Sequence, residues 1–372
     1  MNQKQVKKFD RMMDKRPLVS VLVPLYNQER YFETCIRSIC EQSYDNLEIV
    51  VVNDGSTDRS PQLLDKWAAK DARIRVINKS NEGLVKARRD GYLNATGDYI
   101  VFADSDDMLP RGAIGTLVHD IVEQDVDLVI GSFARLLGSF KWGNSKDYGD
   151  FPTGRVIQQP ELYDKYYISF FGEGHFPFSM WGRIFRKSAI DRALQHTDLF
   201  PDNIRFMGED LNFNMRLFPY LESMYRTGEL VYYYRYGGAV DYFNPHYPEL
   251  LRMTDDRLQL LDERGYDKGY ATLFGEYINM FYFRAQQLID FKQADKDGVI
   301  AYFKQELSER RLVPRFMKYI ADSGSDNQAA LLMLNRDYEG MYEEASRRVR
   351  QLHSTWQCKI KTVMFRILEH LA

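Results

Sequence analysis

The chain has 372 residues, 44% hydrophobic and 28% charged, so it is long enough for two domains with a substantial core. Its 50 basic and 53 acidic residues give a net charge of −3, which argues against general nucleic-acid binding, because phosphate contacts require a basic excess. Three cysteines cannot form a disulfide framework, so we expect a reducing, cytoplasmic location.

Short apolar segments alternate with helical patterns between residues 17 and 137. One such pattern is Phe32, Cys35, Ile36 and Ile39, whose spacing is typical of a helix packed on a sheet. The expected strands are Leu18–Pro24, Leu47–Val52, Arg73–Asn78, Asp98–Ala103 and Asp127–Ser132. This alternation predicts an α/β fold, with a doubly wound, mostly parallel sheet flanked by helices.

The residue composition and periodicity change twice after residue 137. Residues 138–238 are rich in aromatic residues, glycine and proline, and turn-forming composition near 238–246 predicts a domain boundary. The helical patterns that follow are Pro248–Arg264, Ala271–Phe291, Asp297–Glu309, Asn327–Leu352 and Trp356–Leu371. We therefore expect an N-terminal extension over 1–16, an α/β domain over 17–240 with halves at 17–137 and 138–240, and a mainly α-helical C-terminal domain over 241–372.

Acidic residues cluster directly after the expected strand ending at Ala103. Asp104, Asp106 and Asp107 place three carboxylates within four residues, and these repel one another unless a cation neutralises them. Hard oxygen ligands in a turn suit Mg²⁺ or Mn²⁺. The alternative is a solvated acidic turn before the helix that begins near Pro110.

Two segments upstream could contribute to a nucleotide site. Asp54 ends an expected strand and can accept a hydrogen bond from the N3–H of uracil, or it can form an Asx-turn before a helix. Asn81–Gly91 begins a helix whose N-terminus and cations can face a diphosphate, or can form a solvated basic face.

Downstream, Glu209 and Asp210 follow Gly208 at the expected start of a helix. A helix N-terminus lowers a carboxyl pKa, which would keep this acid pair ionised as a base, although plain N-capping explains it equally well. Trp181 can stack on a sugar or pack in the core, and Arg235 can meet a pyrophosphate.

Five of these segments occur in the order found in family 2 glycosyltransferases, and over residues 17–236 the chain resembles that family. They are Val19–Asn27 (VSVLVPLYN), Val51–Asp58 (VVNDGSTD), Asn81–Gly91 (NEGLVKARRDG), Gly97–Asp107 (GDYIVFADSDD) and Gly208–Asp210 (GED). The resemblance implies a GT-A type fold, a nucleotide-sugar donor, a divalent metal (Mn²⁺ or Mg²⁺) and an inverting reaction. One departure is Arg89, which stands where the family usually has asparagine after Ala-Arg.

The resemblance also implies a role for each matching residue. The expected nucleotide-sugar contacts are Pro24, Tyr26, Asn27, Glu29, Asp54, Asn81, Arg88, Asp104 and Ser105. Asp54 would bind uracil, Asp104 the ribose or the metal-bound phosphate, and Asp106 the metal. Asp210 would be the catalytic base, with Glu209 supporting it or touching the sugar, and Trp181 a contact to the acceptor or sugar.

These expectations describe a hexosyl- or N-acetylhexosaminyl-transferase that uses a UDP-sugar to extend a glycan or lipid-linked acceptor in surface-polysaccharide synthesis. The basic, amphipathic pattern Trp356–Leu371 can lie on the inner face of an anionic membrane, or can pack on the helical domain or a second subunit. A sugar nucleotidyltransferase is an alternative, but it would need a glycine-rich phosphate loop where VPLYNQER stands. A non-catalytic glycan-binding scaffold protein is another, and the presence of every expected acid counts against it.

Overall fold

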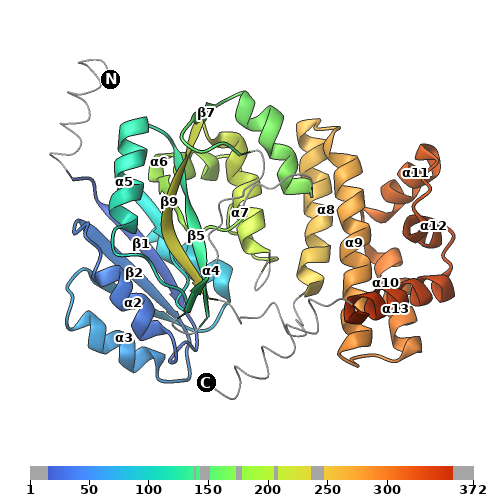
Figure 1. Ribbon diagram of the computed structural model, residues 1–372, viewed down its shortest axis with the longest axis horizontal. Helices are drawn as coiled ribbons and strands as arrows, with labels where there is room; N and C mark the ends of the chain where they lie inside the picture. Colours follow the sequence, from blue (N-terminus) through green and yellow to red (C-terminus); the bar gives the residue numbers. More distant parts are fainter. Residues whose placement is uncertain are drawn as a thin grey trace. The chain divides into compact units, whose positions relative to one another are not determined.

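The structure is a computed structural model that describes residues 16–137, 140–142, 151–172, 178–204, 208–235 and 247–354 (Figure 1). The chain divides into two compact units, Met1–Asp241 and Tyr242–Ala372. Three predictions lie outside the described residues: the N-terminal extension apart from Arg16, the boundary near 238–246, and the helix Trp356–Leu371.

The N-terminal half of the first unit is a parallel sheet. Its strands are β1 (Val19–Leu25), β2 (Leu47–Asp54), β3 (Ile74–Lys79) and β4 (Tyr99–Phe102). β1 lies between β2 and β4, with Val21 opposite both Ile49 and Val101. Every residue of β1 is buried, as expected of a central parallel strand covered on both faces.

Helices cover both faces of this sheet. They are α2 (Phe32–Cys40), α3 (Ser60–Ala68), α4 (Leu84–Leu93) and α5 (Ala113–Gln124). The buried residues of α2 and α5 form one core cluster with Val19, Val21 and Val23 of β1. On the opposite face, Gly91 of α4 lies against Leu22 and Val52.

The other half of the unit extends the sheet. Its elements are β5 (Leu128–Leu137), β6 (Phe140–Trp142), β7 (Val156–Gln158), two short helical turns (Leu162–Tyr166 and Tyr167–Phe171), β8 (Arg183–Arg186), α6 (Lys187–Leu194), α7 (Glu209–Leu217), a 3₁₀ turn (Phe218–Tyr220) and β9 (Ser223–Arg235). Across the described residues the strand order is β3-β2-β1-β4-β8-β5-β9-β7, and β6 pairs with β5. β8 is antiparallel to both β4 and β5, whereas β9 runs parallel to β5.

This mixed sheet, flanked by helices, confirms the predicted fold class (Figure 1). The five strands expected from apolar runs are β1 to β5, with shifts of a few residues at their ends. Strands β6 to β9 were not predicted. Three of them have only three or four residues, and β9 mixes polar and aromatic residues and pairs with β5 through irregular register near Ser132.

The described residues of the second unit are helical. The helices are α8 (Tyr247–Arg264), α9 (Gly269–Asp290), α10 (Lys296–Glu309), α11 (Val313–Ser323), α12 (Gln328–Leu334) and α13 (Tyr338–Ser354). The predicted helix Asn327–Leu352 is divided into α12 and α13, where Arg336 has a left-handed φ of 53°. None of the described helices is both long and apolar enough to cross a membrane.

Candidate functional site

A pocket of about 290 Å³ opens where β1, β2 and β4 end. The carboxyl ends of parallel strands meet at one edge of the sheet, which is where ligands bind in open α/β folds. The lining residues that the sequence predicted are Pro24, Tyr26, Asp54, Asn81, Asp104, Ser105 and Asp106. Gln28, Leu84 and Ala87 also line it and were not predicted.

Asp54 is 3% exposed and connects the end of β2 to the start of α4. Its Oδ1 accepts from the backbone N–H of Glu82 at 2.9 Å, and its Oδ2 accepts from that of Gly83 at 2.8 Å. Gly55 allows the close approach of these segments, since a Cβ there would lie 2.6 Å from the nitrogen of Asn81. Each carboxylate oxygen can accept a second hydrogen bond, so this anchoring leaves Asp54 able to bind a base.

Asn27 and Glu29 do not line the pocket. Oδ1 of Asn27 accepts from the backbone N–H of Thr57 at 2.8 Å, and a carboxylate oxygen of Glu29 accepts from that of Arg59 at 3.0 Å. In return, Asp58 accepts from the backbone N–H of Glu29 at 2.9 Å. These side chains therefore hold the loop after β1 against the loop after β2, a connection that short-range sequence patterns do not reveal.

The acid turn, residues 104–107, follows β4. Burial and the charge of Asp104 raise the pKa of Asp106 to about 6. Burial and the charges of Asp106 and Asp104 raise the pKa of Asp107 well above its usual range. Oδ2 of Asp107 is buried and has no hydrogen-bond partner among the described residues. Mutually repelling carboxylates that are buried or partly buried are suited to neutralisation by a divalent cation.

Arg88 joins this turn to the acid pair Glu209 and Asp210 at the start of α7. Its side chain is 2% exposed; Nη2 donates to Asp104 at 2.8 Å, while Nη1 donates to Glu209 at 3.0 Å and to Asp210 at 2.7 Å. Burial opposes its charge, but the three carboxylates outweigh burial and raise the pKa of Arg88. The guanidinium is thus engaged by acids, and its neighbour Ala87 lines the pocket instead.

The acid pair has raised pKa values. Burial and the charge of Asp210 raise the pKa of Glu209 to about 7. Burial also raises the pKa of Asp210, against the lowering effect of Arg88. The expectation that the helix start lowers the pKa of this pair is therefore wrong, because burial outweighs the partial charge of the helix N-terminus.

Trp181 belongs to an aromatic cluster. Its ring is nearly parallel to those of Tyr232 and Tyr234, with centroid separations of 4.6 and 5.2 Å, and meets Phe133 edge-on at 4.9 Å. The side chain is only half-buried, so this packing leaves the predicted contact with a sugar open.

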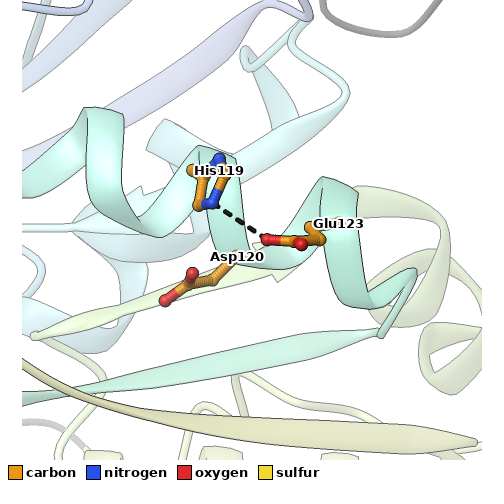
Figure 2. A group of neighbouring side chains, drawn as sticks. All are labelled: His119, Asp120 and Glu123. Carbon is orange, nitrogen blue, oxygen red and sulfur yellow. Dashed lines mark ion pairs between the residues drawn. The ribbon is translucent and has the colours of Figure 1, made fainter. Parts of the chain in front are cut away.

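His119, Asp120 and Glu123 on α5 form a separate group whose ligand atoms lie within 4.8 Å of one another (Figure 2). His119 and Glu123 point toward each other, with 2.9 Å between Nε2 and Oε2, while Asp120 points away. Within the described ranges, no other triad of histidine, cysteine and carboxylate groups is so close. The acid turn therefore offers few converging ligands, which suits Mg²⁺ or Mn²⁺ held by one or two carboxylates together with substrate phosphates.

Known proteins resemble this chain in sequence and in fold. Residues 20–194 match the family described as Glycosyl transferase family 2. EpsJ of Bacillus subtilis, an uncharacterized glycosyltransferase, is 34% identical over 221 residues, which is 59% of this chain and 61% of EpsJ. The glycosyltransferase GlyA of Streptococcus pneumoniae is 32% identical over 221 residues, which is 58% of this chain and 30% of GlyA. This chain thus spans less than two thirds of either relative.

Among solved structures, S. aureus TarS 1–349 has a TM-score of 0.60 at 19% identity, covering 90% of this chain and 91% of that one. The same protein in complex with UDP-GlcNAc has a TM-score of 0.59. At this identity the likeness concerns the fold. The match of residues 20–194 to the family 2 glycosyltransferases and the GT-A type fold agree with the resemblance noted from the motifs.

Replacing Arg88 with glutamine should destabilise the protein strongly, because Asp104, Glu209 and Asp210 would lose their shared cation. Breaking such a buried network costs on the order of 3–5 kcal/mol. The loss of stability in Arg88→Gln should be smaller at pH 5 than at pH 8, because the raised pKa values of Glu209 and Asp210 favour their neutral forms as the pH falls. Thermal unfolding at both pH values measures this, with Arg89→Gln, an exposed arginine on the same helix, as the control. An equal loss at pH 5 and pH 8 would contradict the electrostatic role.

Replacing Glu209 with glutamine should stabilise the protein increasingly as pH rises from 5 to 8. Because the folded-state pKa of about 7 exceeds the usual 4.5, the stabilising contribution of the protonated carboxyl is complete below pH 4.5 and is lost as pH rises through 7. Glutamine mimics the protonated form at every pH, and each kcal/mol gained would appear as about 2–4 °C in Tm. The control is Glu222→Gln, whose carboxylate is 76% exposed. A Tm difference that does not grow with pH would show that Glu209 is already ionised at pH 5.

Proposed function

We propose that this protein is an inverting glycosyltransferase that moves a hexosyl or N-acetylhexosaminyl group from a nucleotide-sugar, expected to be a UDP-sugar, to a hydroxyl of a glycan or lipid-linked acceptor. The observation that carries this proposal is the set of three ion pairs made by Arg88, which hold the acid turn of a strand-end pocket next to the partly buried acid pair on α7. The acid turn can hold a cation that binds the donor diphosphate. The acid pair on α7 can take the proton of the acceptor hydroxyl.

The donor would enter the pocket with its base toward Asp54 and Asn81 and its diphosphate toward the acid turn. Asp106, with a pKa raised to about 6, would hold Mn²⁺ or Mg²⁺, and Asp104 would contact the ribose or a metal-bound phosphate. The cation supplies Lewis-acid stabilisation to the departing diphosphate. The half-buried face of Trp181 remains a candidate contact to the sugar or acceptor.

Asp210 would accept the proton of the acceptor hydroxyl as that oxygen attacks the anomeric carbon. The new C–O bond forms on the face of the anomeric carbon opposite the diphosphate. The bond from that carbon to the diphosphate breaks, and the diphosphate leaves with its electron pair. Burial raises the pKa of Asp210, which makes the carboxylate a stronger base, while Arg88 keeps its charged form accessible. A single base and a metal-assisted leaving group give inversion at the anomeric carbon.

The alternative of a sugar nucleotidyltransferase is less well supported. The loop after β1 is held by two serine hydroxyls: the backbone N–H of Asn27 donates to Oγ of Ser56 at 3.1 Å, and that of Gln28 donates to Oγ of Ser60 at 2.8 Å. It presents Tyr26 and Gln28 to the pocket rather than a glycine-rich cradle of backbone N–H groups. A non-catalytic scaffold protein would have no need to keep the partly buried acids that the site retains.

The setting of the reaction remains a prediction. We propose surface-polysaccharide synthesis on the cytoplasmic side of the membrane. The C-terminal pattern Trp356–Leu371, expected to contact the membrane or a second subunit, lies outside the described residues.

Donor binding should depend on Asp106. A thermal-shift panel of nucleotide sugars, each with and without Mn²⁺, should show the largest stabilisation for a UDP-sugar with Mn²⁺, since Tm rises with ligand concentration relative to Kd. Asp106→Ala should lose the part of the shift that requires Mn²⁺. Asp45→Ala, which removes a carboxylate 68% exposed to solvent, is the matched control. An unchanged metal-dependent shift in Asp106→Ala would refute the metal assignment.

Asp210→Asn should bind the donor almost normally but lose on the order of 10²–10⁴-fold in kcat, because only the proton acceptor is removed. Steady-state transfer assays and donor calorimetry on the same preparation separate the two effects. Asp202→Asn, at a carboxylate 69% exposed, serves as the control. Near-native transfer by Asp210→Asn, or selective loss of donor binding, would place the base elsewhere.

A further inference from the structure

The end of β9 holds the acid turn in place. The backbone N–H of Tyr233 donates to the carbonyl of Met108 at 2.8 Å, and the N–H of Met108 donates back to the carbonyl of Tyr233 at 3.2 Å. This antiparallel bridge fixes the residue that directly follows the acid turn. β9 otherwise pairs with β5 and β7, so the clamp comes from outside the parallel half of the sheet.

Two side chains of β9 extend the clamp to the acids themselves. The hydroxyl of Tyr232, on a side chain only 1% exposed, accepts from the backbone N–H of Asp104 at 3.1 Å. Nε of Arg235 donates to the carbonyl of Asp106 at 2.6 Å. The backbone N–H of Arg235 donates to Oδ1 of Asp107 at 2.7 Å.

A second contact, on the side of Arg235 away from the acid turn, orients its side chain. Its guanidinium lies 4.3 Å from the ring centroid of Tyr31, immediately before α2. This contact and the bond to Asp106 restrict the side chain to one direction, and its positive charge lies beside a turn that carries three carboxylates.

We propose that Tyr232 and Arg235 are positioning residues that hold the acid turn in the geometry required to bind a divalent cation. This inference rests on the proposed function. The direction of each carboxylate depends on the backbone at its own residue, and the two side chains bond to the backbone of Asp104 and Asp106, the proposed ligands. The Tyr232 hydroxyl also interacts with the carboxylate of Asp107, whose pKa it lowers. They therefore act through the ligands without occupying ligand positions, as outer partners of metal sites do.

The decisive variant is Tyr232→Phe, which removes one oxygen and keeps the ring stacked on Trp181. Arg235→Gln tests the second contact while keeping the backbone bond to Asp107. Both should raise the Kd for Mn²⁺, measured by calorimetry without any nucleotide, about 10-fold. Uridine, which has no phosphate and needs no metal, should bind as it does to the unmodified protein. Tyr225→Phe, the same change at a half-buried position of the same strand, is the control and should alter neither.

The measurement separates positioning from general damage. A purely structural role for the hydroxyl would lower Tm and weaken uridine and Mn²⁺ together, whereas positioning weakens Mn²⁺ at nearly unchanged Tm. Unchanged Mn²⁺ affinity in both folded variants, or an equal loss of uridine binding, would overturn the inference and leave the proposed function standing. If the unmodified protein bound neither Mn²⁺ nor a UDP-sugar, the proposed function would fail and this inference with it.

Discussion

The structure of the candidate site depends on one buried guanidinium. Arg88 is nearly inaccessible to solvent, yet its two terminal nitrogens meet Asp104, Glu209 and Asp210. Burying a charge is costly unless it is paired and hydrogen-bonded, and the planar fork of arginine can satisfy several carboxylates at once. α4 supplies the cation, the turn after β4 supplies one acid, and α7 supplies the other two, so this contact unites the two halves of the first unit.

The sequence predicts the parallel half of the fold well because its strands are buried on both faces. Such strands are continuous apolar runs, and they alternate with amphipathic helices, as β1 and α2 illustrate. The sequence also predicts that Asp54 lies close to the acid turn, because parallel strands end at the same edge of the sheet. The contact of Arg88 with Asp210 does not follow, because 122 residues separate them and no local pattern encodes the pairing. The same holds for β8 and β9, whose places in the sheet depend on long-range pairing.

Local rules also fail where burial competes with them. A carboxyl group at a helix start should have a lowered pKa, and Asp210 occupies that position on α7, yet its pKa is raised. The helix N-terminus offers a fraction of a charge, whereas removing a carboxylate from water costs far more. Asn27 and Glu29 illustrate a related limit: the family resemblance implies nucleotide contacts for them, while in the structure their side chains join two loops and do not line the pocket. Sequence motifs thus identify polar residues near a site more reliably than they distinguish the contacts each one makes.

Under the proposed metal assignment, the raised carboxyl pKa values mean that protons and the cation compete for this site. Without a cation, the folded protein holds protons on Asp106 and Glu209 at pH values where the unfolded chain would release them, because burial and neighbouring acids disfavour the charged forms. A divalent cation favours the ionised form of its ligands, so its binding must release protons, and its affinity must rise with pH. Arg88 spreads this effect beyond the acid turn, because Asp104 shares its guanidinium with Asp210. Under the proposed assignment, a ligand that engaged Asp104 would leave Arg88 with fewer competing acids and would strengthen its interaction with Asp210. Occupation of the donor side is therefore expected to change the basicity of the acid pair on α7 through a single side chain.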